Sequence, residues 1–476
     1  MVTMQDGAEV AKHASRESCW VVLHGKVWDV TDFIAQHPGG AGVILRTAGQ
    51  DATEAYDEVH SPELVVDTLP SECCLGSVDP ATIPSLKDSQ KPAQEQKQVD
   101  QGAVQFPPLT SIVSVDDFEK VAQTYLTPTG WAYYCSGADD EYSIADARRL
   151  FRRIALRPRI LRRVEPVCTK INLLGHPSSL PIYFSPTGLG KYAYKDADAE
   201  SVIATAAGKE GLIYCMPTSA VHDAVFGARC MPGQRLFFQL YTGRDRERCK
   251  ALIRKVEKLG AAAIFLTVDS PVLGKRERDD RIKAAEGDDV IVSGGLAKKS
   301  SMGLLNPLLS WEDLDWIRET TSLPLVIKGV QTVEDAVLAY AHGANGIVLS
   351  NHGGRSQDTA QSPMLTLLEI RRHAPSLLSA PVKDRFQILL DGGVRRGTDV
   401  VKAVALGAAA VGVGRPVLYS MCAGYGEGGL RRLVAILRAE IETNMALAGA
   451  SCVEELVPEM VNSERAENEV SRRVKL

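Results

Sequence analysis

The stretch Gly346-Ile347-Val348-Leu349-Ser350-Asn351-His352-Gly353-Gly354-Arg355 joins a buried strand to a group of reactive side chains. The apolar run Gly346 to Leu349 predicts a strand, and the polar residues follow it directly. His352 is a candidate general base, and Arg355 is a cation of the kind that binds carboxylates. Removal of a proton beside a bound carboxylate is the chemistry that oxidation of a 2-hydroxy acid requires. A glycine-rich turn with a capping histidine is the alternative for this segment alone.

Seven further apolar runs show the same order of strand and helical segment. The eight runs span residues 180–184, 212–215, 236–240, 263–268, 325–328, 346–350, 387–391 and 410–414. Continuous apolar strands that alternate with helices indicate a parallel sheet covered on both faces, and eight such units favour an α/β (β/α)8 TIM barrel. A doubly wound open sheet is the alternative.

Polar residues gather at the carboxyl ends of these strands, the face that carries the active site in such barrels. They are Gln239, Tyr241, Thr267, Asp269, Lys328, Ser350, His352, Asp391 and Arg415. The last two strands end in Asp391-Gly392-Gly393-Val394-Arg395 and Gly412-Val413-Gly414-Arg415. Glycines there let backbone amides approach an anion while the arginines supply charge, so we expect a phosphorylated ligand.

The first 80 residues carry a different pattern. Apolar runs at 19–23 and 26–30 flank His24-Gly25 and predict a hairpin. His37 stands in Gln36-His37-Pro38-Gly39-Gly40, where proline and glycines end a helix, and His60 follows on a second short segment. Two such histidines can hold one haem iron from both sides, which leaves the iron to pass single electrons.

Composition excludes several classes of protein. The 476 residues are 45% hydrophobic and 24% charged, typical of a globular protein of two or three domains. No apolar run approaches the roughly 18 residues of a membrane span, and Met1 to Gly7 shows no export signal. The ten cysteines form no Cys-x-x-Cys motif, so we expect free thiols and no structural zinc.

Charge is divided between the two parts of the chain. Residues 1–80 carry 4 Lys and Arg against 13 Asp and Glu, a net charge of −9, and the remainder is +4. The acidic segment argues against nucleic acid and suits brief docking with a basic protein, although acidic surfaces also serve solubility. We expect a haem domain over 1–79, a flexible linker over 80–106, the barrel over 107–451 and a charged surface tail over 452–476.

Two resemblances support this division. Residues 5–78 resemble the cytochrome b5 family, with its His-Pro-Gly-Gly motif at His37 and its second axial histidine at His60. Residues 107 to about 450 resemble the FMN-dependent 2-hydroxy-acid-oxidizing family in the stretches 131–138, 238–241, 267–271, 274–277, 326–330, 350–355 and 391–397. Fused in this order, the two are similar to the flavocytochrome b2 family of lactate dehydrogenases, which implies FMN and haem b as cofactors and cytochrome c as a protein acceptor.

The resemblance implies a role for each site residue. His352 would be the base, Asp269 would stabilise its imidazolium, and Tyr241 would hydrogen-bond the substrate hydroxyl. Arg355 and Tyr133 would hold the carboxylate, with Arg276 as a second cation, and Lys328 would favour the negative charge of reduced flavin. The FMN-binding residues would be Thr187, Gly188, Gln239, Tyr241, Thr267, Lys328, Ser350, Asp391, Gly392, Gly393, Arg395, Gly414 and Arg415.

Three positions depart from the family pattern. Tyr214 stands near a usual serine, Gly188 replaces a common alanine, and Met216 is unusual. The smaller and more flexible side chains leave lactate as the leading substrate but admit a bulkier 2-hydroxy acid.

Other readings of function remain open at this stage. One is an oxidase that uses O2, with a regulatory haem domain, and another is a phosphate-binding isomerase fused to a haem-binding interaction module. The resemblance also implies a homotetramer. We expect a cytosolic protein or a mature mitochondrial one, since the terminal Val474-Lys475-Leu476 is a poor match to a peroxisomal signal.

Overall fold

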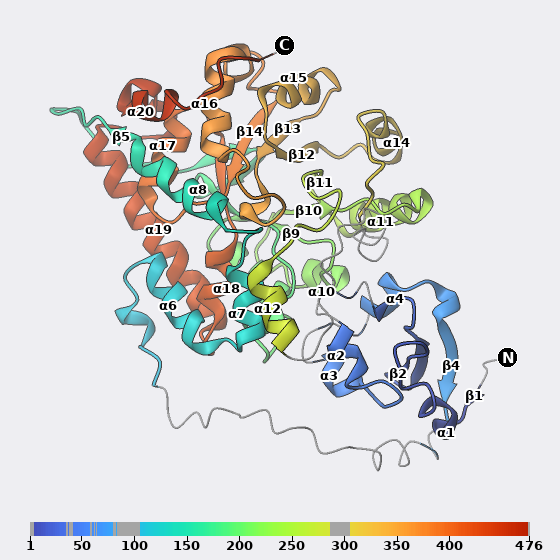
Figure 1. The fold of residues 1–476 in the computed structure, drawn as a ribbon. Helices are drawn as coiled ribbons and strands as arrows, with labels where there is room; N and C mark the ends of the chain where they lie inside the picture. Colours follow the sequence, from blue (N-terminus) through green and yellow to red (C-terminus); the bar gives the residue numbers. More distant parts are fainter. Residues whose placement is uncertain are drawn as a thin grey trace. The chain divides into compact units, whose positions relative to one another are not determined.

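The computed structural model describes residues 4–34, 37, 41–57, 60, 62, 64–79, 82, 105–285 and 305–474. The chain divides into two compact units, one built around residues 1–107 and the other around 108–278 and 305–476 (Figure 1). Most of the predicted linker, 80–106, lies outside the described residues, so its flexibility stays a prediction.

The first unit is a small sheet with short helices. Among its described residues, four strands lie in the order β1 (Met4–Gln5), β4 (Cys74–Val78), β3 (Lys26–Asp29) and β2 (Trp20–Leu23). The predicted hairpin is confirmed, because Leu23 pairs with Lys26 and both turn residues have positive φ, 51° at His24 and 74° at Gly25. The helices are α1 (Gly7–Val10), α2 (Ala41–Leu45), α3 (Thr53–Asp57) and α4 (Leu64–Thr68).

The second unit contains the predicted barrel. Among the residues that the structure describes, eight parallel strands close on themselves, which rules out the open sheet. They are β8 (Ile182–Phe184), β9 (Ile213–Met216), β10 (Leu236–Leu240), β11 (Ile264–Thr267), β12 (Leu325–Val330), β13 (Gly346–Leu349), β14 (Gln387–Asp391) and β15 (Ala410–Val413).

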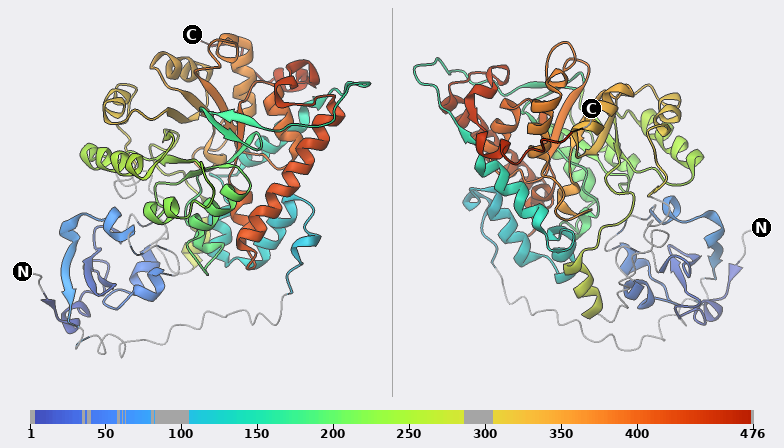
Figure 2. Two further views of the ribbon diagram at one scale, coloured as in Figure 1. Left: turned by 180° about the vertical axis from the view of Figure 1, so that it is seen from behind. Right: turned by 45° about the horizontal axis from the view of Figure 1, so that its top comes forward.

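Helices surround the strands in both turned views (Figure 2). They are α9 (Ala199–Lys209), α10 (His222–Gly227), α11 (Arg246–Leu259), α14 (Asp313–Thr320), α15 (Val333–Ala341), α16 (Pro363–His373), α17 (Gly397–Ala405), α18 (Arg415–Met421) and α19 (Gly426–Ala448). In the chain, α12 (Glu277–Ala285) follows β11. Ahead of the barrel lie α6 (Val115–Tyr125), α7 (Pro128–Cys135) and α8 (Tyr142–Arg153). The hairpin of β6 (Ile171–Leu173) and β7 (His176–Ser178) precedes the first barrel strand.

Strand alternation places the polar residues inside the barrel mouth. Phe237, Phe265, Val326, Val348 and Leu389 form one buried cluster. Successive side chains of a strand point to opposite faces, so the residue two positions later shares the inward face. Those residues are Gln239, Thr267, Lys328, Ser350 and Asp391. The alternation of side chains along the strands therefore places a layer of polar side chains directly above a layer of apolar ones inside the barrel.

The predicted surface tail is wrong for residues 452–470. This segment forms β16 (Val461–Asn462), which pairs antiparallel with β5 (Ala155–Leu156), and ends in α20 (Glu464–Glu467). Val453, Met460, Ala466 and Val470 are buried. The charged residues of this segment face outward, while a few apolar residues are buried. The high content of charged residues conceals this pattern in the sequence.

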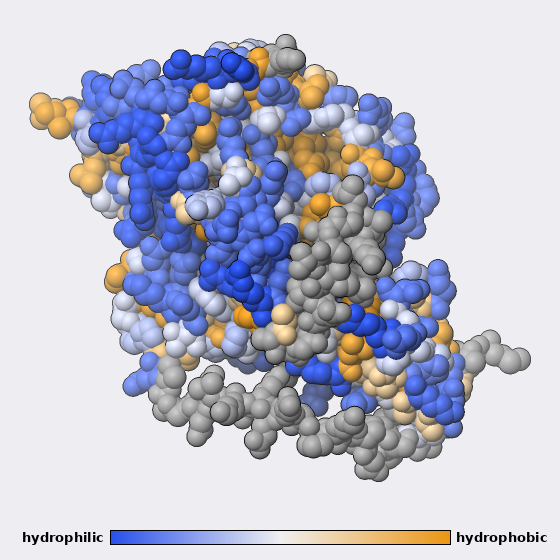
Figure 3. Space-filling model, viewed as in Figure 1, coloured by the Kyte–Doolittle hydropathy of each residue, from blue (hydrophilic) through white to orange (hydrophobic). Residues whose placement is uncertain are grey.

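Most of the surface in one view is hydrophilic (Figure 3). Within the described residues, no helix combines the length and the apolar character needed to cross a membrane. The loop after β5 carries Ile160 and Leu161, which are 83% and 99% exposed.

Candidate active site

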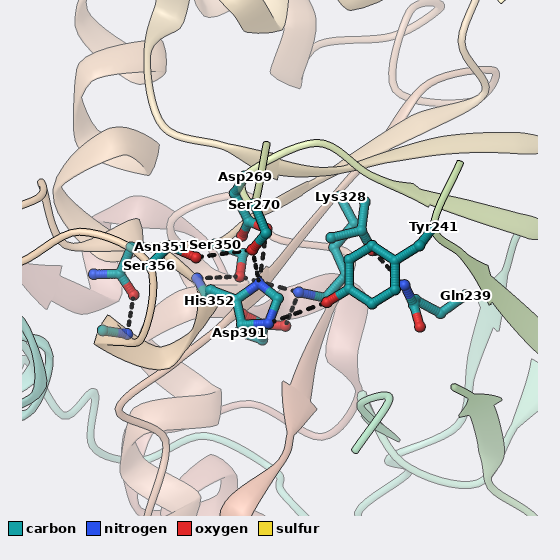
Figure 4. Close-up of polar contacts among 12 residues, drawn as sticks. Gln239, Tyr241, Asp269, Ser270, Lys328, Ser350, Asn351, His352, Ser356 and Asp391 are labelled. Carbon is teal, nitrogen blue, oxygen red and sulfur yellow. Dashed lines mark hydrogen bonds and ion pairs between the residues drawn. The ribbon is translucent and has the colours of Figure 1, made fainter. Parts of the chain in front are cut away.

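A histidine and an aspartate form the centre of the site. His352 begins the turn that follows β13, with φ at 57°, and its Nδ1 lies 2.7 Å from Oδ1 of Asp269 (Figure 4). Its backbone N–H donates to Oγ of Ser350 at 3.1 Å. Burial opposes ionisation of Asp269, but the charges of His352 and Lys328 outweigh it and lower the pKa of the carboxyl group. Asp269 is therefore an anion that stabilises a protonated His352.

Tyr241 faces the other nitrogen of the imidazole. Its hydroxyl lies 3.3 Å from Nε2 of His352. Burial raises the pKa of Tyr241, so the phenol keeps its proton and can donate a hydrogen bond. A substrate hydroxyl placed here would meet a donor and a base together.

Tyr133 brings two arginines together. The guanidinium of Arg355 lies 4.9 Å from the centre of the Tyr133 ring, and that of Arg276 lies 5.8 Å from it. Arg355 also donates to the carbonyl oxygens of Tyr133 and Ser136, at 2.5 and 3.2 Å. The buried Nε of Arg276 has no hydrogen-bond partner among the described residues. Two guanidiniums beside one ring make a site for an anion such as a carboxylate.

Lys328 is the buried cation of the polar layer. Its Nζ lies 3.4 Å from Oδ2 of Asp391 and donates to Oγ of Ser350 at 3.3 Å. Burial would lower the pKa of Lys328, but the carboxylates of Asp391 and Asp269 raise it above its usual value, so the ammonium persists. In the same layer, Nε2 of Gln239 donates to Oγ1 of Thr267 at 3.0 Å.

The predicted phosphate-binding residues lie at the ends of β14 and β15. Gly392 and Gly393 have φ of 94° and 79°, in the region that favours glycine. A Cβ on Gly414 would stand 3.6 Å from Cγ2 of Thr187, so these two predicted positions are neighbours. The side chain of Arg395 is 11% exposed, and its Nη2 lies 3.5 Å from Oε1 of Glu119. Its buried Nη1 has no hydrogen-bond partner within the described part of the chain.

Arg415 makes hydrogen bonds that its motif did not predict. Its guanidinium donates to the carbonyl oxygens of Tyr134, Gly353 and Ser136 at 2.8, 2.8 and 2.9 Å. These bonds tie α7 to the turn that carries His352. The arginine thus supports the catalytic turn here, and a direct role in phosphate binding stays a prediction.

The donor set fits a phosphorylated, polar cofactor. Oγ1 of Thr187 and Nη1 of Arg395 are buried and have no hydrogen-bond partner among the described residues. Buried polar atoms in proteins are rarely left without a hydrogen bond. Thr187, Arg395 and the glycine turns would hold a phosphate, and Lys328, Gln239 and Thr267 would hold a ring with acceptor atoms.

The small unit presents its two predicted ligands to each other. The ring centres of His37 and His60 are 5.9 Å apart, with the ring planes at 76°. This separation is close to the roughly 6 Å expected when two imidazoles hold one metal through metal–nitrogen bonds of about 2 Å. The ring of Tyr56 lies 4.9 Å from that of His60. The pair therefore suits a bis-histidine haem.

The three unusual positions lie on or beside one strand. Tyr214 and Met216 belong to β9 and are fully buried. A Cβ on Gly188 would stand 2.7 Å from Oγ of Ser219. No contact of Met216 or Gly188 with a substrate follows from this, so their effect on the pocket stays a prediction.

Four residues of the site were missed by the motif analysis. Oγ of Ser270 lies 3.1 Å from Nδ1 of His352 and 2.9 Å from Oγ of Ser356 (Figure 4). Gly329, with φ of 111°, lets Asp269 approach, since a Cβ there would stand 2.5 Å from Cβ of Asp269. Gly274 does the same for the backbone of Ser356. The sequence offered one indication of these four residues, which is that each lies within or next to a motif already noted.

Comparison with known proteins agrees with this geometry. Residues 122–463 match the FMN-dependent dehydrogenase family, and residues 6–79 match the cytochrome b5-like heme/steroid binding domain. The chain is 38% identical to L-lactate dehydrogenase (cytochrome) of Wickerhamomyces anomalus, over 96% of this chain and 80% of the relative. It is 39% identical to glycolate oxidase of Spinacia oleracea, over 72% and 94%.

Solved structures give the same result. A flavocytochrome b2 variant with benzoylformate matches with a TM-score of 0.72 at 36% identity, over 79% of this chain and 93% of that one. Mandelate oxidase matches with a TM-score of 0.64 at 34% identity, over 74% and 98%. With His352, the buried Lys328 and the paired histidines in place, the chain belongs to the FMN-dependent dehydrogenase family and carries a cytochrome b5-like haem domain before its barrel.

Proposed function

We propose that this chain oxidises L-lactate to the 2-oxo acid and passes the electrons through its haem to a protein acceptor such as cytochrome c. The observation that carries the proposal is the placement of His352, Asp269 and Tyr241 beside two arginines. The relatives that span both domains are lactate dehydrogenases of the cytochrome type, which supports this substrate.

Each side chain has one task in this proposal. Arg355 and Arg276 bind the carboxylate, and the Tyr241 hydroxyl orients the substrate hydroxyl. Nε2 of His352 accepts the substrate proton, and the buried Asp269 anion stabilises the charge that results. Bound FMN supplies a two-electron acceptor, and the haem passes electrons singly. Lys328 would favour the negative charge of the reduced flavin.

Two other functions were open from sequence. The isomerase is excluded, because the barrel belongs to an FMN-dependent dehydrogenase family. The oxidase is supported by the glycolate oxidase relatives, which match the barrel without the haem domain. The paired His37 and His60 favour the cytochrome-linked reaction.

The electron acceptor separates the two remaining functions. The holoenzyme is mixed with L-lactate in air, with and without cytochrome c, and cytochrome reduction and hydrogen peroxide are both measured. We expect rapid cytochrome reduction and little peroxide. Peroxide at the rate of substrate oxidation, with a slow response of cytochrome c, would favour the oxidase.

The size of the substrate needs its own comparison. The likeness to mandelate oxidase and to a benzoylformate-bound variant suggests room for an aromatic side chain. kcat/KM for L-lactate, glycolate and L-mandelate would rank the three. We expect the highest kcat/KM for L-lactate. A higher kcat/KM for L-mandelate would make L-mandelate the proposed substrate instead.

Assembly and compartment belong to the same proposal. We infer a homotetramer, supported by Ile160 and Leu161, which a second copy would cover. Light scattering on the wild type and on Leu161→Asp would test this, since a monomeric wild type contradicts it. A cytosolic or mitochondrial location remains a prediction. Detection of the tagged protein in peroxisomes would contradict it.

A further inference from the structure

Ser270 lies beside the base and has no task in the proposed reaction. Its Oγ is 3.1 Å from Nδ1 of His352, 3.4 Å from Oδ1 of Asp269 and 2.9 Å from Oγ of Ser356 (Figure 4). The side chain therefore contacts both members of the central pair.

The tautomer of His352 decides whether it can act as a base. A neutral imidazole carries one proton, and Nε2 must lack it to accept another from the substrate. The proton must then sit on Nδ1, where Asp269 accepts it at 2.7 Å. If the Ser270 hydroxyl donated to Nδ1, the proton would be moved to Nε2 and the base would be lost.

Ser356 offers the Ser270 hydroxyl another acceptor. Oγ of Ser356 lies 2.9 Å away and can accept a hydrogen bond from the Ser270 hydroxyl, as can Oδ1 of Asp269 at 3.4 Å. Either arrangement leaves a lone pair of Ser270 to accept from the N–H of His352. The packing of the two loops holds this arrangement. A Cβ on Gly274 would stand 2.3 Å from the carbonyl oxygen of Ser356 and 2.4 Å from that of Arg355, so only glycine permits the contact.

We propose that Ser270, oriented by Ser356, is a positioning residue for the base. It accepts a second hydrogen bond from the N–H at Nδ1, favours the tautomer with Nε2 free, and stabilises the imidazolium formed during turnover. The proposal rests on the proposed function, in which His352 is the base.

Ser270→Ala should lower kcat by about three- to tenfold, the size of one net hydrogen bond, with little change in KM. Loss of an acceptor weakens the hydrogen bonding of the protonated imidazole, so the acidic limb of the kcat/KM profile should move to lower pH by roughly half a unit to one unit. Ser270→Thr keeps the hydroxyl and should restore both. Ser356→Ala should act in the same direction, and the exposed Ser379→Ala is the control.

A second readout does not depend on turnover. In holoenzyme with ¹⁵N-labelled histidine, and with His352→Gln to assign the signal, NMR should show Nδ1 protonated in the wild type. In Ser270→Ala the share of the tautomer protonated at Nδ1 should fall. An unchanged kcat and pH profile, or a limb that moves to higher pH, would overturn the proposal. If the wild type failed to reduce flavin with L-lactate, the proposed function would fail, while the NMR comparison would still decide the role of Ser270.

Discussion

At the scale of single residues, His352 was predictable and its surroundings were not. Its position after an apolar strand, with Arg355 three residues later, indicated a base beside a cation. The partners of its Nδ1 lie 82 and 83 positions away, and they meet it only because glycines at 274 and 329 let the loops approach. Such contacts depend on loop packing, which local patterns do not encode.

Removal of the base should abolish substrate oxidation. We expect His352→Gln to slow flavin reduction by L-lactate by about 10²- to 10⁴-fold, the usual contribution of a general base. FMN should stay bound, because the predicted phosphate-binding residues at the ends of β14 and β15 are unchanged. Stopped-flow reduction and FMN content are the measurements, with the exposed His342→Gln as control. A loss of only a few-fold would remove His352 from this role.

Gly188 tests whether the pocket is widened. If it lines the space beside the substrate side chain, Gly188→Ala should reduce kcat/KM for L-mandelate about 10- to 200-fold more than for L-lactate. The new Cβ would stand 2.7 Å from Oγ of Ser219, so Gly188→Ala with Ser219→Ala separates this clash from lost volume. Equal losses for both substrates would show that Gly188 does not sense side-chain size.

At the scale of elements, the barrel strands followed directly from the sequence. The predicted and observed bounds of all eight differ by at most two residues, because strands buried on both faces are apolar throughout. The segment after residue 452 was misjudged, because its few apolar residues are separated by charged ones. Whether such residues pack depends on β5, which lies some 300 residues earlier.

Helix α9 contains a buried carboxyl group that should make stability depend on pH. Burial raises the pKa of Glu200 from 4.5 to about 7, although its Oε1 accepts the N–H of Gly190 at 3.1 Å. Between these two values the folded state holds the proton more tightly than the unfolded state. The stability it confers is therefore present at low pH and is lost as pH rises through this window.

Glu200→Gln removes that dependence while keeping an acceptor for Gly190. The free energy of unfolding of the variant, relative to that of the wild type, should rise by up to about 3 kcal/mol between pH 5 and pH 8. Denaturant unfolding of the holoenzyme at the two pH values would measure the gain. If the variant and the wild type differed in free energy of unfolding by the same amount at pH 5 and pH 8, the raised pKa of Glu200 would be contradicted.

At the scale of the whole molecule, each unit carries its own set of cofactor residues. The predicted haem ligands His37 and His60 lie within residues 1–79, and the predicted base, lysine and phosphate-binding turns lie in the second unit. The division of charge, −9 in the first 80 residues and +4 in the remainder, was visible in the sequence. A reaction in which the barrel receives electrons from the substrate and the haem delivers them requires transfer between the units.

Rapid mixing of the holoenzyme with L-lactate without oxygen tests this account most directly, with flavin and haem absorbance followed separately in wild type and His37→Ala. In the wild type we predict that flavin is reduced first and haem afterwards. In His37→Ala, which lacks one of the two predicted axial ligands, flavin should be reduced at the same rate, without haem reduction and without reduction of added cytochrome c. A wild-type haem that stays oxidised while flavin is reduced, or slower flavin reduction in His37→Ala, would contradict the account.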